Sequence, residues 1–546
     1  MMNSSLLFNS LAHSPFHLNE ARRQWVQATF AALSNDEKIG QTLLPLLPDL
    51  EQASLDAVLR VPVGGVFRMH QGPLAALQQS ARYLQARSKL PLLMPGDLEY
   101  VENGAIGQGA MLSNQLALAA THNTRLLADA ARIAALEGRN AGYNWSFSPI
   151  VDLSIHPRNP IVCTRSFGSD PEQVAELGAR YIASMQQHGM AACAKHWPGD
   201  GMGDTDQHLL LSENPLSFER WQETYGAIYR RMIDGGVLSV MSAHISLPSV
   251  DASGAPASLS AKLNLDLLRE QLGFAGVIVS DASTMAGMTS QAKRADLVAA
   301  CIENDCDILL FPEDVEADFN HLKTALREGR LSQQRLDAAV LRILALKAAL
   351  GLAETRVEAV PFDAAAHAET ARDIAQGCLT LLRDDAQILP LSPQKYPRVL
   401  LIQPQRRDTI LGAGATLQIA SLLQAQGFAV TPFTTGMQIS PALFDLVLVT
   451  TADEAALCKA YIGIDWQNLQ PGLHHAMQRF WHDIPTVFIS LGNPYQAQEV
   501  AQCPTVILGY CPSAPIQEAL VQALMGNIPF LGKNPVRLEI KATVEF

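Results

Sequence analysis

The segment GVIVSD (276–281) consists of small and apolar residues that end in a carboxylate. Short runs of this kind alternate with segments of helical periodicity through about the first 315 residues, a pattern typical of strand–helix units around a parallel sheet. Eight runs predict an N-terminal (β/α)8 TIM barrel, although a proline interrupts the first. They are TLLPLL (42–47), GGVFRM (64–69), LLMPGD (92–97), NWSFSP (144–149), AACAKH (191–196), LSVMSAH (238–244), GVIVSD (276–281) and DILLFP (307–312).

A second alternating set follows the first one. A helical stretch from about 313 to 352 ends the barrel pattern, and AETRVEAVPFDAAAH (353–367) is typical of a connector. Four more apolar runs then indicate a smaller three-layer domain: VLLIQP (399–404), LVLVTT (446–451), TVFISLG (486–492) and TVILGY (505–510). We therefore predict a barrel domain at 1–352, a linker at 353–375 and an α/β sandwich domain at 376–546.

Composition and charge exclude several classes of partner. The 546 residues are 48% hydrophobic and 17% charged, and the formal net charge of −13 is spread without basic blocks, which argues against nucleic acid. No apolar run approaches the roughly 20 residues that span a bilayer. The first 23 residues carry no basic residue before Arg22, and the eight cysteines form no C-x-x-C pair. We expect a cytoplasmic protein that acts on a small ligand.

Polar residues end several of the predicted strands. Asp281 ends one run, three others end in Asp97, in Lys195 with His196, and in His244, and Asp152 comes just past a fourth. Since chemistry in such barrels collects at the carboxyl ends of the strands, we expect a functional site there. A carboxylate in the position of Asp281 can be a nucleophile, a metal ligand or the N-cap of the next helix.

The segment AKHWPGDGMGDTDQH (194–208) allows several interpretations. A calcium loop would need D-x-D-x-D spacing and a closing glutamate, and a phosphate loop would need G-K-S/T, all of which are missing here. Asp204, Asp206 and His208 offer zinc ligands on alternate residues, but without a H-E-x-x-H motif. A loop that only turns the chain at its glycines is a further alternative.

A proton relay fits this segment best. Asp206 and His208 are two apart, so in an extended loop they project to the same side and can form a hydrogen bond. Such a carboxylate orients the imidazole and favours its protonated form, which lets histidine donate a proton. Asp281 could supply the nucleophile opposite the relay. We accordingly predict no metal ion and no cofactor.

The same residues resemble a known family. AACAKHWPGDGMGDTDQH (191–208) resembles the K-H-(F/W)-P-G-(H/D)-G-x4-D-x-H signature of the β-N-acetylglucosaminidases, or β-hexosaminidases, of glycoside hydrolase family 3. Further matches are MPGDLE (94–99), RSFGSDPEQV (165–174), GVIVSDASTMAG (276–287) and SLGNPY (490–495). The resemblance implies a barrel followed by an α/β sandwich, and retaining hydrolysis that removes terminal β-linked N-acetylglucosamine from a small glycan.

The resemblance also implies roles for individual residues. Asp281 is expected to be the nucleophile, His208 the general acid/base and Asp206 its partner. The residues expected to hold the hydroxyls of the sugar are Asp97, Arg165, Lys195 and His196. His244 receives no role.

Two departures from the family pattern and three rival functions accompany this prediction. DLEYVENGA (97–105) lacks the glycine pair and the arginines that follow D-x-E in single-domain members, and Asp200 stands where many members have histidine.

An imidazole acid/base carries no negative charge after donating its proton, so phosphate could approach, and a phosphorylase on the same scaffold is a rival. A β-glucosidase and a sugar-binding protein without activity are the others.

Overall fold

The computed structural model describes residues 4–68, 72–99, 106, 109–357, 360–405, 408–409, 412–413, 416–459 and 461–539. The chain forms two compact units. The first unit consists of Met1–Ala110, Leu127–Asp152 and Pro171–Ala364, and the second of Met111–Leu126, Leu153–Asp170 and Ala365–Phe546.

The strands of the first unit are short and lie where the apolar runs predict them. They are β1 (Leu43–Leu44), β2 (Leu46–Leu47), β3 (Phe67–Arg68), β4 (Pro95–Gly96), β5 (Trp145–Ser146), β6 (Cys193–Trp197), β8 (Ser239–Ser242), β10 (Val277–Ser280) and β11 (Leu309–Leu310). An outlying pair, β7 (Ser212–Glu213) and β9 (Ile245–Ser246), joins two loops. Apart from Leu46, every residue of the nine strands listed first is buried, as expected for strands covered on both faces.

All pairings between these strands are parallel. β10, β8 and β6 form one sheet, while β2 pairs with β3, β4 with β5, and β1 with β11. Isolated parallel bridges link the short sheets: Gly65 with Leu93, Trp145 with Ala191, and Val279 with Ile308. Neighbours in the chain are therefore neighbours in space, and the first and last runs also pair.

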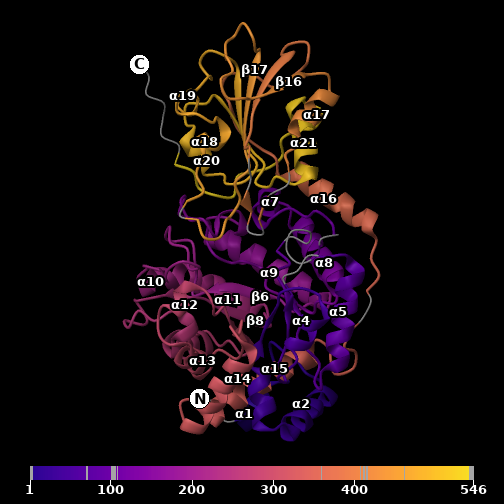
Figure 1. The fold of residues 1–546 in the computed structure, drawn as a ribbon, viewed down its shortest axis with the longest axis vertical. Helices are drawn as coiled ribbons and strands as arrows, with labels where there is room; N and C mark the ends of the chain where they lie inside the picture. Colours follow the sequence, from indigo (N-terminus) through magenta and orange to yellow (C-terminus); the bar gives the residue numbers. More distant parts are fainter. Residues whose placement is uncertain are drawn as a thin grey trace. The chain divides into compact units, whose positions relative to one another are not determined.

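Helices surround the strands of the first unit, as Figure 1 shows around β6 and β8. They are α1 (Ser4–Ser10), α2 (Glu20–Ala32), α3 (Asn35–Gln41), α4 (Gln52–Ala57), α5 (Leu74–Arg87), α8 (Thr124–Asn140), α9 (Pro171–Gln187), α10 (Phe218–Trp221), α11 (Ala227–Asp234), α12 (Ala286–Thr289), α13 (Arg294–Glu303), α14 (Val315–Glu328) and α15 (Gln333–Ala349). Two π-helical segments, Gln222–Gly226 and Lys262–Gln271, and a 3-10 turn, Ala257–Leu259, complete the helices of this unit. No helix among the described residues is long and apolar enough to cross a membrane.

The second unit is built on a six-stranded sheet of order β12-β19-β18-β17-β13-β16, parallel except for β12. Figure 1 shows α17 and α21 on one side of this sheet and α18 and α20 on the other. Its strands are β12 (Thr380–Asp384), β13 (Arg398–Ile402), β16 (Ala429–Pro432), β17 (Leu446–Thr451), β18 (Thr486–Ser490) and β19 (Thr505–Leu508), with a separate hairpin of β14 (Asp408–Thr409) and β15 (Gly412–Ala413). Its helices are α7 (Gln115–Ala120), α16 (Ala364–Cys378), α17 (Ile419–Ala425), α18 (Trp466–Leu469), α19 (Leu473–Ala476), α20 (Gln496–Glu499) and α21 (Ala514–Leu524), with a 3-10 turn at Cys163–Arg165.

The two units are not consecutive in the chain, unlike the predicted ranges 1–352 and 376–546. Two segments that lie between strands of the first unit belong to the second, because their apolar side chains are buried in its core. Leu116, Ala117 and Ala120 of α7 are part of the main core of the second unit. Cys163 packs with Ala455, Ala456 and Ile462. Much of the predicted linker, 353–375, is helix α16, whose Ala375 also lies in that core.

Candidate active site

The predicted strand-end residues of the first unit lie directly at its strand ends. Asp97 follows β4, Lys195 and His196 lie within β6, His244 follows β8, and Asp281 follows β10. Parallel strands place their carboxyl ends at one edge of a sheet, so β6, β8 and β10 present these side chains on the same side. The fold thereby brings together residues that are far apart in the sequence.

Lys195 is held between two carboxylates. Its Nζ donates to Oδ1 of Asp97 at 3.0 Å and lies 2.9 Å from Oε1 of Glu99. The lysine side chain is only 4% exposed, whereas that of Asp97 is 37% exposed. Charge-assisted hydrogen bonds of this kind fix the direction of a carboxylate. The exposed oxygen edge of Asp97 can then accept hydrogen bonds from sugar hydroxyls.

The predicted hydrogen bond between Asp206 and His208 is present. Nδ1 of His208 lies 2.6 Å from Oδ1 of Asp206, and the same oxygen accepts the backbone N–H of His208 at 2.8 Å. The side chain of Asp206 is 2% exposed and that of His208 22%. Because the carboxylate can only accept, Nδ1 carries the hydrogen, and Nε2 is the nitrogen left to exchange a proton with a substrate.

The loop that carries this pair is attached to the segment that follows Asp281. The backbone N–H of Ala286 donates to the carbonyl of His208 at 3.2 Å, and the N–H of Gly287 donates to that of Gln207 at 3.1 Å. From the other side, the N–H of His244 donates to Oε1 of Gln207 at 3.0 Å. The candidate acid/base and the candidate nucleophile are thus parts of one hydrogen-bonded assembly.

Asp281 is kept ionised by its surroundings. Burial alone would raise the pKa of its carboxyl, but the charges of His196, His244 and His208 and a hydrogen bond from the N–H of Ala282 outweigh burial and lower the pKa below its usual 3.8. The N-cap interpretation is wrong, because α12 begins only at Ala286 and its N-cap is Met285. A partly buried, ionised carboxylate without that structural task is suited to nucleophilic attack.

His244 supports the backbone beside Asp281. Its Nε2 lies 2.9 Å from the carbonyl oxygen of Ala282, which requires a hydrogen on Nε2, and its Nδ1 lies 2.8 Å from Oγ of Ser258. Burial lowers the pKa of this imidazole, against the opposing effect of the Asp281 charge. The sequence predicted His244 at a strand end without a role, and these hydrogen bonds show that it holds the backbone next to Asp281.

A second carboxylate–histidine pair lies at the same strand ends. Nδ1 of His196 lies 2.6 Å from Oδ2 of Asp152, and the backbone N–H of His196 donates to Oδ1 of Asp152 at 3.1 Å. The sequence predicted that both residues lie near the site but not that they contact each other, because 44 positions separate them in the chain. The parallel bridge between Ile150 and Lys195 creates this contact.

The two remaining predicted features are Arg165 and the zinc alternative. Arg165 lies in the 3-10 turn Cys163–Arg165 of the second unit, where one guanidinium nitrogen donates to the carbonyl of Ile161 at 3.3 Å, and its contact with sugar stays a prediction. Asp204, a member of the zinc alternative, is exposed, whereas Asp206 is buried. In the described part of the chain, no group of three or more His, Cys, Asp or Glu side chains is placed to hold a metal ion.

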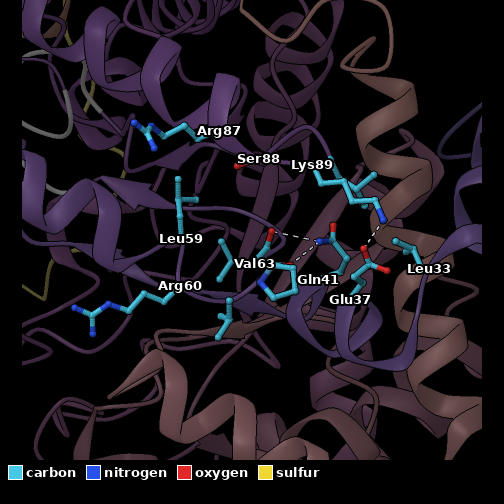
Figure 2. A pocket seen from close by; sticks show the side chains of 12 residues that line it. Leu33, Glu37, Gln41, Leu59, Arg60, Val63, Arg87, Ser88 and Lys89 are labelled. Atoms are coloured by element: carbon cyan, nitrogen blue, oxygen red, sulfur yellow. Dashed lines mark hydrogen bonds and ion pairs between the residues drawn. The ribbon is translucent and has the colours of Figure 1, made fainter.

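A cavity of about 220 Å³ lies elsewhere in the first unit (Figure 2). Its lining comes from the end of α3, the segment before β3 and the end of α5, so it lies near the amino ends of strands rather than at the site. Glu37 and Lys89 form an ion pair there, and Gln41 donates to the carbonyls of Pro62 and Val63. Arg60 and Arg87 point away from Gln41 in Figure 2. The cavity shows no converging set of groups for catalysis.

A parallel α/β unit with an ionised carboxylate and a carboxylate–histidine pair at its strand ends has the arrangement of a glycosidase. Residues 34–346 match the family described as glycosyl hydrolase family 3 N terminal domain, and the chain belongs to glycoside hydrolase family 3. It is 36% identical over 556 residues to a β-N-acetylglucosaminidase/β-glucosidase of Cellulomonas fimi, covering 96% of this chain and 98% of the relative.

Two solved structures extend the comparison to three dimensions. The β-glucoside phosphorylase BglX bound to 2FGlc has 31% sequence identity and a TM-score of 0.90, covering 97% of this chain and 99% of the other. A glycoside hydrolase family 3 β-N-acetylglucosaminidase from Paenibacillus sp. str. FPU-7 has 25% identity and a TM-score of 0.80, covering 94% of this chain and 100% of the other. The similarity includes both units of the chain.

Proposed function

We propose that this protein is a retaining glycosidase that removes terminal β-linked N-acetylglucosamine, and that its first unit is a (β/α)8 barrel. The observation that carries the proposal is the attachment of the Asp206–His208 loop to the segment following Asp281. The name of the Cellulomonas fimi relative includes this activity together with that of a β-glucosidase. Eight parallel runs with intervening helices, in which β11 pairs with β1, support the barrel.

In the first step, the carboxylate of Asp281 attacks the anomeric carbon and forms a glycosyl-enzyme ester. At the same time Nε2 of His208 donates a proton to the glycosidic oxygen, which leaves as an alcohol. Asp206 stabilises the imidazolium that exists before the transfer and keeps Nδ1 from acting as the donor. Asp97, Lys195 and His196 hold the hydroxyls of the sugar.

In the second step, His208 is neutral and accepts a proton from water. The water oxygen attacks the anomeric carbon, the ester bond to Asp281 breaks, and the sugar leaves with its original β configuration. The side chain of His208 is partly exposed, which is compatible with a water molecule approaching the ring. Asp281 returns to the ionised state that its surroundings favour.

A second candidate is phosphorolysis, and a specific observation favours it. The chain is similar over nearly its full length to a β-glucoside phosphorylase. With a neutral imidazole as acid/base, the glycosyl-enzyme faces no second carboxylate at that position, so an anionic nucleophile is not repelled there. Phosphate would then take the place of water in the second step and yield a sugar 1-phosphate.

One experiment separates these functions. Turnover of nitrophenyl β-N-acetylglucosaminide and nitrophenyl β-glucoside is measured with and without inorganic phosphate, and the products are identified by chromatography. The proposal expects preference for the acetamido sugar and free N-acetylglucosamine as the product. A sugar 1-phosphate as the main product would establish the phosphorylase, preference for glucoside a β-glucosidase, and sugar binding without turnover a binding protein.

A further inference from the structure

Asp152 is a fully buried carboxylate, 0% exposed, that accepts three hydrogen bonds from one turn of chain. Oδ2 bonds Nδ1 of His196 at 2.6 Å, and Oδ1 accepts the backbone N–H of His196 at 3.1 Å and that of Asp200 at 2.8 Å. Through Asp152, these contacts connect His196 with Asp200, the residue at the start of the glycine-rich loop that leads to Asp206. One side chain therefore fixes both ends of the turn His196–Asp200.

The Asp152–His196 pair repeats the local pattern of the Asp206–His208 pair. In both, one carboxylate bonds Nδ1 of the histidine at 2.6 Å and accepts the backbone N–H of the same residue. The difference is exposure, since the His196 side chain is 6% exposed and that of His208 is 22%. A buried imidazole is poorly placed to exchange protons with water, but well placed to act as a fixed hydrogen-bonding group.

The fixed imidazole matters for the nucleophile. Among the charges that lower the pKa of the Asp281 carboxyl against the effect of burial, that of His196 is the largest. If the imidazole of His196 rotated away, its effect on the pKa of Asp281 and its proposed contact with the sugar would both be lost. Holding the ring by a carboxylate prevents such a rotation and dictates which nitrogen carries the hydrogen.

We propose that Asp152 is a positioning residue for catalysis, which orients the imidazole of His196 toward the sugar and fixes Asp200 at the start of the acid/base loop. The inference rests on the proposed function. Asp152 acts through His196 and Asp200, the two residues that it holds. The loop end has a second anchor, because the hydroxyl of Tyr225 donates to the carbonyl of Asp200.

The first test compares Asp152→Asn with Asp251→Asn. Asp251 is also buried, and its partners Ser253, Ser260 and Lys262 lie outside the candidate site, so it controls for loss of a buried carboxylate. We expect Asp152→Asn to lower kcat/KM at least 100-fold for both nitrophenyl and dinitrophenyl substrates, without rescue by azide. Asp251→Asn, corrected for the folded fraction, should stay within threefold of the native enzyme.

The second test is a double-mutant cycle that includes His196→Gln. If Asp152 acts through His196, adding Asp152→Asn to His196→Gln should lower kcat/KM by no more than the effect of the lost Asp200 contact. Tyr225→Phe, which removes the hydroxyl that anchors the carbonyl of Asp200, provides the scale of that effect. Fully additive losses, or a loss for Asp152→Asn that disappears once the folded fraction is taken into account, would overturn the proposal.

A third measurement does not depend on activity. The imidazole ¹⁵N spectrum of the native protein should show Nδ1 of His196 carrying a hydrogen that is bonded to Asp152, and Asp152→Asn should shift the Nδ1 resonance by weakening that hydrogen bond. An unchanged His196 spectrum would refute the positioning role even if the enzyme acts on another glycoside. Failure of all glycosides to turn over, together with the expected spectral change, would instead contradict the proposed function alone.

Discussion

The carbonyl oxygen of Gln207 lies 3.1 Å from the backbone nitrogen of Gly287, which donates a hydrogen bond to it. Gln207 stands between Asp206 and His208, and Gly287 belongs to α12, just after Asp281. This single contact, with its neighbour between Ala286 and His208, attaches the candidate acid/base to the element that follows the nucleophile. The distance between proton donor and nucleophile is therefore set by backbone hydrogen bonds rather than by a freely moving loop.

Replacing His208 by alanine should harm substrates in proportion to the basicity of their leaving groups. A poor leaving group such as an oligosaccharide needs the proton from Nε2, whereas dinitrophenolate leaves without it, so losses of about 10²–10⁴-fold are expected for the first and far smaller losses in bond cleavage for the second. Azide should restore the second step, since it needs no base. Equal slowing of all substrates, with no effect of azide, would show that His208 only shapes the loop.

Asp206→Asn should give a weaker form of the same behaviour. The amide oxygen can still accept the backbone N–H of His208, so the loop keeps its shape, but the negative charge that stabilises the imidazolium is lost. The slope of log kcat/KM against leaving-group pKa should lie between those of the native enzyme and His208→Ala. A slope identical to that of the native enzyme would exclude a part for Asp206 in proton transfer.

Asp281→Asn should lower turnover by several orders of magnitude for every substrate, because no nucleophile remains. In the native enzyme an activated 2-fluoro sugar should label Asp281, which peptide mass spectrometry detects. The lowered pKa of this carboxyl keeps it ionised at and above pH 3.8, so a fall of kcat/KM between pH 7 and 5 must report another group. The same fall of kcat/KM with pH should appear in the control variant Asp251→Asn. Native activity in Asp281→Asn would show that Asp281 is not the nucleophile.

Sequence alone predicted much of this arrangement because strand ends are determined by local patterns. The runs ending at His196 and at Asp281 contain strands in the structure, and the spacing of Asp206 and His208 predicted their hydrogen bond correctly. The pairing of Asp152 with His196 could not be predicted, since it depends on which strands are neighbours. The same holds for α7, whose burial in the second unit is not visible in its periodicity.

Lys347 should limit stability near neutral pH. The side chain is completely buried, its Nζ donates to Oε1 of Gln41 at 2.5 Å, and burial, aided by the charge of Arg356, lowers the pKa of the ammonium from 10.5 to about 7. The unfolded chain binds this proton up to about pH 10.5, so the stability of the folded state rises with pH between 7 and 10.5, and the full cost applies below pH 7. Below pH 7 the shifted pKa of Lys347 thus lowers the free energy of unfolding by about 5 kcal/mol.

Lys347→Met should therefore raise the free energy of unfolding at pH 6 by about 2–4 kcal/mol, after subtracting about 1–3 kcal/mol for leaving Gln41 without its donor. The gain should shrink as the pH rises toward 10. Urea unfolding at pH 6, 8 and 10 measures it, with Lys323→Met as the matched control, since Lys323 is an exposed partner of Asp36. A gain that does not depend on pH would show that Lys347 is not buried as a titrating group.

Gly287→Ala should disturb catalysis through the contact between Gly287 and Gln207. A Cβ at this position would lie 2.8 Å from Cβ of His244 and 2.9 Å from the carbonyl oxygen of Gln207, so the acid/base loop must move away. We expect a loss of stability of about 1–3 kcal/mol and a fall in kcat of at least tenfold, larger for poor leaving groups because His208 moves with Gln207.

The matched control is Gly203→Ala in the loop itself, where a Cβ would meet no atom within 4 Å. If the loop works by being held in place, Gly203→Ala should keep nearly native turnover. If both variants lose activity equally, the flexibility of the glycine-rich loop, rather than its attachment at Gly287, controls the position of His208.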